Sequence, residues 1–400
     1  MNADIVASLT NAVWPAALAF AWLTAELLFR RLAVPRLASY AMVGFAYGQL
    51  PLPAFGAAVG ATATPAVTLA AYVALGLFLF ELGCRVNLSW FRHNPMLLLT
   101  GVLESLATFA ASYAAMIALG LSDHDSLVIG ALCAASSPVA VLRVTLEANA
   151  AGQLTDRIMH LTAINVVVSM VVLKMLIGHS YLAAGDWTIA AWTSVTVLLA
   201  SSAAGCAFGL LTPWLLVRVA GTRRSAPALL AVAVALLTTL ADALTLSPLL
   251  AALAFGLTLR LRSSPTTLAE RGFGLVADLL ALFLFVFAAS LLTLAAVIGG
   301  FVAGTLLLLI RLLTKVGLAA ALARPSGTTL RKGALTGLAL APLSALPILL
   351  AEHSRVYGFS LGAEAVAALS AMVLLLDLLG PFATRLALLA AGEGSARKDL

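Results

Sequence analysis

Four charged residues lie well inside long apolar stretches of the chain: Glu104, Arg311, Lys315 and Asp377. A charge within a membrane-length apolar segment is costly and by default marks a functional site. Arg311 and Lys315 are four residues apart, so on a helix they share one face and need a counter-charge or water. Glu104 and Asp377 are the two acidic candidates in this set. For each carboxylate, simple neutralisation of a basic residue is the alternative.

Three more polar residues stand in apolar stretches. For Arg143 and Lys174, an extended side chain that reaches the end of its helix is favoured over a role in a site. Asn165 offers an amide oxygen to a bound ion, or a hydrogen bond that packs two helices together.

Two apolar stretches are broken in the middle by proline. Ser136 and Ser137 precede Pro138 in the stretch 126–147, and Pro342 and Pro347 interrupt the stretch 333–352. Proline removes a backbone donor, and inside a bilayer the freed groups must be satisfied by protein or by a water-filled cavity. Paired broken helices indicate the binding site of a transporter.

The elements that must position these residues are membrane-spanning helices, each of about 20 mostly apolar residues. The sequence predicts thirteen spans, near residues 9–29, 37–50, 63–83, 96–119, 126–147, 158–178, 187–217, 226–241, 245–261, 273–291, 294–322, 333–352 and 362–391. Thirteen divides into six, one and six. We therefore expect a first repeat in 1–180, a linker helix in 181–220 and an inverted repeat in 221–400. Each break falls on the fifth span of its six.

Composition supports an all-α polytopic membrane protein forming a single transport domain. The 400 residues are 62% hydrophobic and 10% charged, against about 25% charged residues in soluble domains. Basic residues gather in alternate loops, which predicts an N-terminus outside and a C-terminus in the cytoplasm. The net charge of +6 follows from these loops and does not indicate nucleic-acid binding.

Enzyme chemistry is not indicated. The three cysteines are scattered through apolar segments without metal-ligand spacing. The sequence has no nucleotide-binding loop and no Ser-His-Asp constellation, so we expect neither an enzyme nor a cofactor nor a metal. After Ala390 about ten residues remain, too few for an ATPase, so the expected energy source is an ion gradient.

Several motifs in order resemble the monovalent cation/proton antiporter superfamily, in its bacterial Na⁺/H⁺ and K⁺/H⁺ exchanger branch of thirteen-span type. The motifs are Val34-Pro35 with Gly44 and Gly48, Leu79-Phe80-Glu81-Leu82-Gly83, Ala135-Ser136-Ser137-Pro138, Leu246-Ser247-Pro248 through Gly256, and Lys315. The resemblance implies two crossed broken helices, a site lysine at Lys315 and a homodimer in the bacterial inner membrane. It also implies that Glu104 and Asp377 lie in the moving core.

One departure from the family matters most. The family places an aspartate, which binds the cation and carries the proton, next to the position of Asn165; here that position is Val166. A carboxylate can hold either a cation or a proton, whereas valine can hold neither. The usual Gly-Glu of the second broken helix is also replaced, by residues 341–344.

Three hypotheses about the function remain. The first is a cation/proton antiporter with oxygen ligands from Ser136, Ser137 and Asn165, charge balance from Lys315, and Glu104 or Asp377 as proton carrier. The second is a transporter of the same fold for an anionic or organic substrate. Basic residues and the positive N-terminal ends of half-helices would hold the anion at the crossing. The third is a homologue that no longer transports. The first is preferred.

Overall fold

The computed structural model describes residues 3–49, 65–182, 187–218, 226–262, 274–343, 347 and 361–394. In this part of the chain every regular element is an α-helix. The elements are α1 (Ala3–Leu32), α2 (Arg36–Gly48), α4 (Pro65–Arg85), α5 (Leu88–His93), α6 (Pro95–Ala118), α7 (Asp123–Ala134), α8 (Pro138–Glu147), α9 (Gln153–Leu182), α10 (Trp187–Arg218), α11 (Ala226–Ala243), α12 (Pro248–Arg262), α14 (Gly274–Ser290), α15 (Leu294–Gly299), α16 (Phe301–Ala321), α17 (Leu330–Ala339) and α19 (Ala363–Ala390).

Eight helical segments of the described chain are long and apolar enough to cross a membrane, with α7 and α8 counted as one, and the shorter α14 is also apolar. The protein is therefore a multi-pass helical membrane protein. The predicted spans match these helices to within a few residues at most ends. The total of thirteen and the repeat boundaries stay predictions, since parts of the second, twelfth and other spans lie outside the described residues.

Two elements differ from the prediction. The predicted span 294–322 consists of α15 and α16, separated at Gly300, where a side chain would collide with the backbone of Ala367 on α19. The short helix α5 was not predicted. It begins because the Asn87 side chain accepts a hydrogen bond from the backbone N–H of Ser89, 3.1 Å away.

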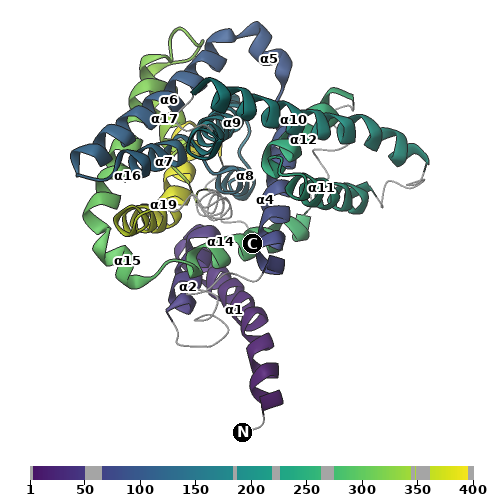
Figure 1. Cartoon of the computed structure of the whole chain (residues 1–400), viewed down its shortest axis with the longest axis vertical. Coiled ribbons are helices and arrows are strands. Elements are labelled where there is room, and N and C mark those ends of the chain that lie inside the picture. Colours follow the sequence, from purple (N-terminus) through teal and green to yellow (C-terminus); the bar gives the residue numbers. More distant parts are fainter. Residues whose placement is uncertain are drawn as a thin grey trace.

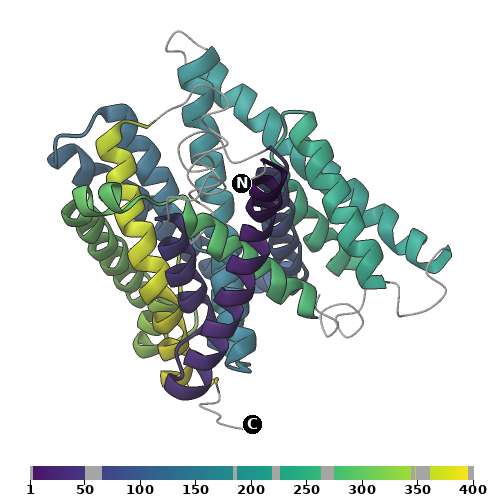
Figure 2. The same ribbon diagram turned by 90° about the horizontal axis from the view of Figure 1, so that it is seen from below.

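The helices gather into two groups with α4 between them (Figure 1). One group contains α6 to α9, α16, α17 and α19. The other contains α10, α11 and α12, which pack against one another, and α11 and α12 also pack against α4. In the perpendicular view, α19 runs beside α16 (Figure 2). The three helices α1, α2 and α14 pack together, and α2 also contacts α19.

Pairs of glycines four residues apart mark the closest helix contacts. Gly44 and Gly48 of α2 lie against the backbone of α14, and Gly205 and Gly209 of α10 lie against α12. Gly304 lies against α19 in the same way as Gly300. Small residues at this spacing let backbones approach closely in a membrane, where association depends on packing.

The two broken segments meet in the middle of the first group. The first break is the extended stretch 135–137 between α7 and α8, and in the second break α17 ends at Ala339 and 340–343 are not helical. The backbone N–H of Ser137 donates to the carbonyl of Pro342 at 2.8 Å, and the Ser136 hydroxyl donates to the carbonyl of Leu340 at 2.9 Å. Each break thus satisfies freed backbone groups of the other. Pro138 begins α8, and Pro342 and Pro347 are buried.

Candidate functional site

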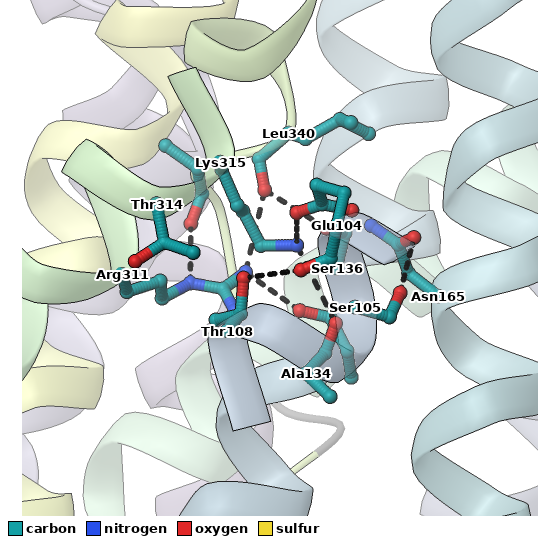
Figure 3. A network of polar contacts seen from close by, with 12 residues as sticks. Glu104, Ser105, Thr108, Ala134, Ser136, Asn165, Arg311, Thr314, Lys315 and Leu340 are labelled. Atoms are coloured by element: carbon teal, nitrogen blue, oxygen red, sulfur yellow. Dashed lines mark hydrogen bonds and ion pairs between the residues drawn. The ribbon is translucent and has the colours of Figure 1, made fainter. Parts of the chain in front are cut away.

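A buried ion pair stands beside the crossing. Lys315 of α16 pairs through its Nζ with the Glu104 carboxylate of α6, and both side chains are excluded from solvent (Figure 3). Lys315 Nζ also lies 3.4 Å from the carbonyl of Ala134, at the end of α7. The sequence predicted the central place of Lys315. Glu104 is the counter-charge that the basic face of α16 required, and its second oxygen, Oε2, has no hydrogen-bond partner within the described residues.

Arg311 has a different task from Lys315, although both project from one face of α16. Its guanidinium donates to backbone carbonyls of both breaks (Figure 3). These carbonyls belong to Cys133 and Ala135 of the first break and to Leu340, Ala341 and Pro342 of the second, with the Ala135 contact at 2.6 Å. A planar guanidinium with five donors can bridge two chain segments in this way. Arg311 therefore ties the two broken helices together.

The helix ends that contact Arg311 and Lys315 in the described chain are carboxyl ends. For an anion transporter, the sequence analysis expected the N-termini of half-helices to supply positive potential at the crossing. In the described chain, α7 and α17 point their carbonyl ends at Arg311 and Lys315, and such ends carry partial negative charge. The N-terminus of α8 is capped locally, since Ser137 Oγ accepts from the N–H of Ala140 at 3.2 Å. The basic residues thus neutralise negative ends and do not add to positive ones.

A chain of polar side chains joins α6, α9 and the first break. Ser105 Oγ donates to Asn165 Oδ1 at 2.7 Å, and Asn165 Nδ2 donates to Ser136 Oγ at 3.1 Å. The sequence-predicted ligands Ser136 and Asn165 are therefore neighbours at the crossing, and Ser137 is adjacent in the chain. Val166 is fully buried beside Asn165, so the position where the family places its aspartate is apolar here.

Asp377 of α19 is buried to 1% exposure, and neither oxygen of its carboxyl group has a hydrogen-bond partner among the residues that the structure describes. It shares a helix face with Gly380 and Thr384, at i, i+3 and i+7. A Cβ on Gly380 would lie 3.0 Å from the Cα of Pro342, and Thr384 Oγ1 donates to the carbonyl of Ala339 at 3.0 Å. The face of α19 that carries Asp377 therefore packs against the second break.

Arg143 lies away from the crossing, in the middle of α8. It forms ion pairs with Glu81 of α4 at 3.3 Å and with Asp278 of α14 at 2.8 Å. These three line a charged cavity of about 560 Å³, together with further charged residues: Glu26, Arg36, Arg85 and Glu147. The sequence analysis did not single out Glu81 or Asp278 as candidate site residues. The spacing of Glu81 and Arg85, an i,i+4 ion pair at 3.1 Å, was the available signal.

Crossed broken helices with buried charges at the crossing define the class of secondary transporters built on discontinuous membrane helices. The family model of the sodium/hydrogen exchanger, transmembrane region, matches residues 16–389. The chain belongs to that family. No curated protein sequence matches the chain significantly.

The fold also resembles that of the sodium proton antiporter MjNhaP1 from Methanocaldococcus jannaschii. One structure of it, at pH 8, superimposes with a TM-score of 0.69 and 16% identity, covering 96% of each chain. A second, an electron-microscopy structure of the same antiporter, gives a TM-score of 0.70 and 16% identity, covering 99% of this chain and 100% of that one. At this identity the likeness concerns the fold.

Proposed function

We propose that the protein is a secondary antiporter that exchanges a monovalent cation, Na⁺ or K⁺, for protons across the membrane. Membership of the exchanger family and the crossed breaks support this function. The observation that carries this proposal is that the two buried basic side chains, Lys315 and Arg311, already have partners. Lys315 is paired with Glu104, and Arg311 donates to five carbonyls, so neither is free to hold an anion.

The ion site is atypical. The oxygens available at the crossing belong to Ser136, Ser137 and Asn165, and Lys315 balances charge. A carboxylate must carry the proton, and because Val166 cannot, Glu104 or Asp377 takes this role. A cation reaching the Ser136 hydroxyl would use the lone pair that is left after its hydrogen bonds to Leu340 and Asn165.

For the cellular setting we propose the inner membrane of a bacterium, with the N-terminus outside and the C-terminus in the cytoplasm. The alternation of basic loops supports this orientation. A homodimer is proposed from the family resemblance, formed by helices outside the broken-helix group.

Reconstitution into liposomes with a trapped pH dye tests the function. Under an imposed pH gradient, we expect Na⁺, Li⁺ or K⁺ to drive proton movement, and N-methylglucamine or empty liposomes to give none. Proton movement that is driven by added chloride or small carboxylates, at a constant cation concentration, would instead favour a transporter of anionic substrates. Silence in wild type with flux in Val166→Asp would mean that the chain keeps the antiporter frame without the exchange.

A further inference from the structure

Asp377 is a buried acid that no side chain in the described part of the chain neutralises. Its carboxyl oxygens lack hydrogen-bond partners and its side chain is sealed from solvent. An ionised carboxylate in such surroundings is strongly unfavourable, and such a group takes up a proton or holds a cation. Both the protonated and the cation-bound carboxyl group avoid an uncompensated buried charge. An exchanger needs a group that can alternate between these two states.

The charged groups on the helices around α19 have other partners. On α16, Lys315 pairs with Glu104 and Arg311 donates to the breaks. Other charged side chains on elements packed against α19 are also engaged: Arg36 with Glu26, Asp123 with the hydroxyl of Tyr113, Asp125 with the N–H of Gly362, Arg143 with Glu81 and Asp278, Glu147 with Arg36, Arg331 with the carbonyl of Ala390, and Lys332 with Glu393. Within the described chain, no cation is within ion-pair distance of Asp377.

The backbone at Asp377 offers a further oxygen. In a helix the carbonyl of residue 377 accepts from the N–H of residue 381, and that residue is proline. Pro381 has no N–H, so the Asp377 carbonyl lacks its usual helical donor. Carboxylate and carbonyl oxygens are the ligands that hard monovalent and divalent cations prefer. Asp377 thus has both a carboxylate and a backbone carbonyl without a helical donor.

The position of Asp377 mirrors that of the absent aspartate. Asn165 and Val166 lie on α9, the last span of the first predicted repeat, and Asp377 lies on α19, the last span of the second. The helix α9 packs against α7, α8 and α17, and α19 packs against the same three. Gly380 lies against Pro342 of the second break. Asp377 is three residues earlier in the same helix, which is about 4.5 Å along the helix axis. Both helices therefore flank the crossing.

We propose that Asp377 is the group that exchanges a proton for the cation, and that the cation site lies between α19 and the second break instead of on α9. The proposal rests on the proposed antiport. In the exchange step the O–H bond of the Asp377 carboxyl breaks, the proton leaves to water, and the incoming cation takes its place on the carboxylate. The Glu104–Lys315 pair then has a supporting role, since it is already neutral.

Infrared difference spectroscopy of the purified protein tests this directly. A protonated carboxyl group without hydrogen-bond partners has a distinct carbonyl band, and Asp377→Asn should remove it from the wild-type spectrum. Adding Na⁺, Li⁺ or K⁺ at constant ionic strength should abolish the same band and release protons. A cation-sensitive band that persists in Asp377→Asn and disappears in Glu104→Gln would overturn the assignment, as would a band that no cation affects.

Flux measurements separate this proposal from the proposed function. We expect cation-driven proton flux to fall at least a hundredfold in Asp377→Asn, with a thermal midpoint close to wild type because a protonated Asp and Asn are both uncharged. Glu364→Gln, an exposed acid at the start of α19, is the matched control and should leave band and flux unchanged. Full flux in Asp377→Asn refutes the site alone. A cation-sensitive Asp377 band in a protein without flux refutes the antiport but keeps the site.

Discussion

At the scale of single residues, the Glu104–Lys315 pair is the costliest feature of the crossing if either partner is lost. Lys315→Met leaves a carboxylate buried without its ion partner, and breaking such a pair typically costs about 3–5 kcal/mol. We expect the free energy of unfolding to fall by this amount. The double variant Glu104→Gln/Lys315→Met should recover most of the loss, because an apolar or neutral pair needs no counter-charge. Thermal unfolding in detergent at neutral pH measures both.

If the double variant is as unstable as Lys315→Met alone, the two residues are not coupled and the ion pair does not account for the cost. Glu104→Gln alone should lie between wild type and Lys315→Met, since Lys315 keeps its contact with the carbonyl of Ala134.

The sequence identified these residues by type and depth, but not by partner. A charge in an apolar stretch is visible from composition alone, and Glu104, Lys315, Arg311 and Asp377 were all found in this way. Pairing depends on side chains that are 211 residues apart in the case of Glu104 and Lys315. No local pattern reports such a distance, so the unpaired state of Asp377 could not be read before the fold was known.

At the scale of elements, Arg311 holds together the carboxyl ends of α7 and α17, and geometry matters more than charge in this role. Arg311→Lys keeps the positive charge but replaces a planar five-donor group by a compact ammonium. Hydrogen bonds to charged groups contribute about 1.5–3 kcal/mol each, so we expect a loss of about 3 kcal/mol or more in the free energy of unfolding. The midpoint of thermal or denaturant unfolding in detergent is the measurement.

Arg331→Lys is the matched control, because the exposed Arg331 makes one hydrogen bond to the carbonyl of Ala390 at 2.9 Å. It should change stability by less than about 0.5 kcal/mol. Equal effects of the two substitutions would show that the guanidinium geometry at the crossing has no special value.

Both breaks were predictable, since proline inside an apolar stretch has a local physical meaning. Their crossing was supplied by family resemblance, and the clamp by Arg311 was missed because its partners are backbone carbonyls, which every residue has. The glycine pairs show the same limit. Gly44 and Gly48 indicate a close helix contact from spacing alone, but only the fold identifies α14 as the partner.

At the scale of the whole molecule, the segment after α19 connects both halves of the chain. Glu393 accepts hydrogen bonds from the N–H groups of Leu154 and Thr155, at the start of α9, and pairs with Lys332 of α17 at 3.1 Å. Neither contact was predicted, because the sequence marks Glu393 only as one acid in a short polar tail. A carboxylate at the first turn of α9 also meets the positive end of that helix.

These contacts of Glu393 make the stability of the folded protein depend on pH. Burial alone would raise the pKa of Glu393, but the bonds from Leu154, Thr155 and Lys332 outweigh it and hold the pKa below its usual value of 4.5. A lowered pKa in the folded state stabilises the protein above the unfolded pKa, and the gain is lost as pH falls through the folded value.

Glu393→Gln should therefore lower stability at neutral pH, by about 1 kcal/mol as for a lost helix cap, and the difference from wild type should shrink as pH falls below 4.5. Thermal unfolding of both proteins between neutral and acid pH gives the two curves. A gap that persists unchanged into acid would assign the effect of Glu393 to packing and not to its charge.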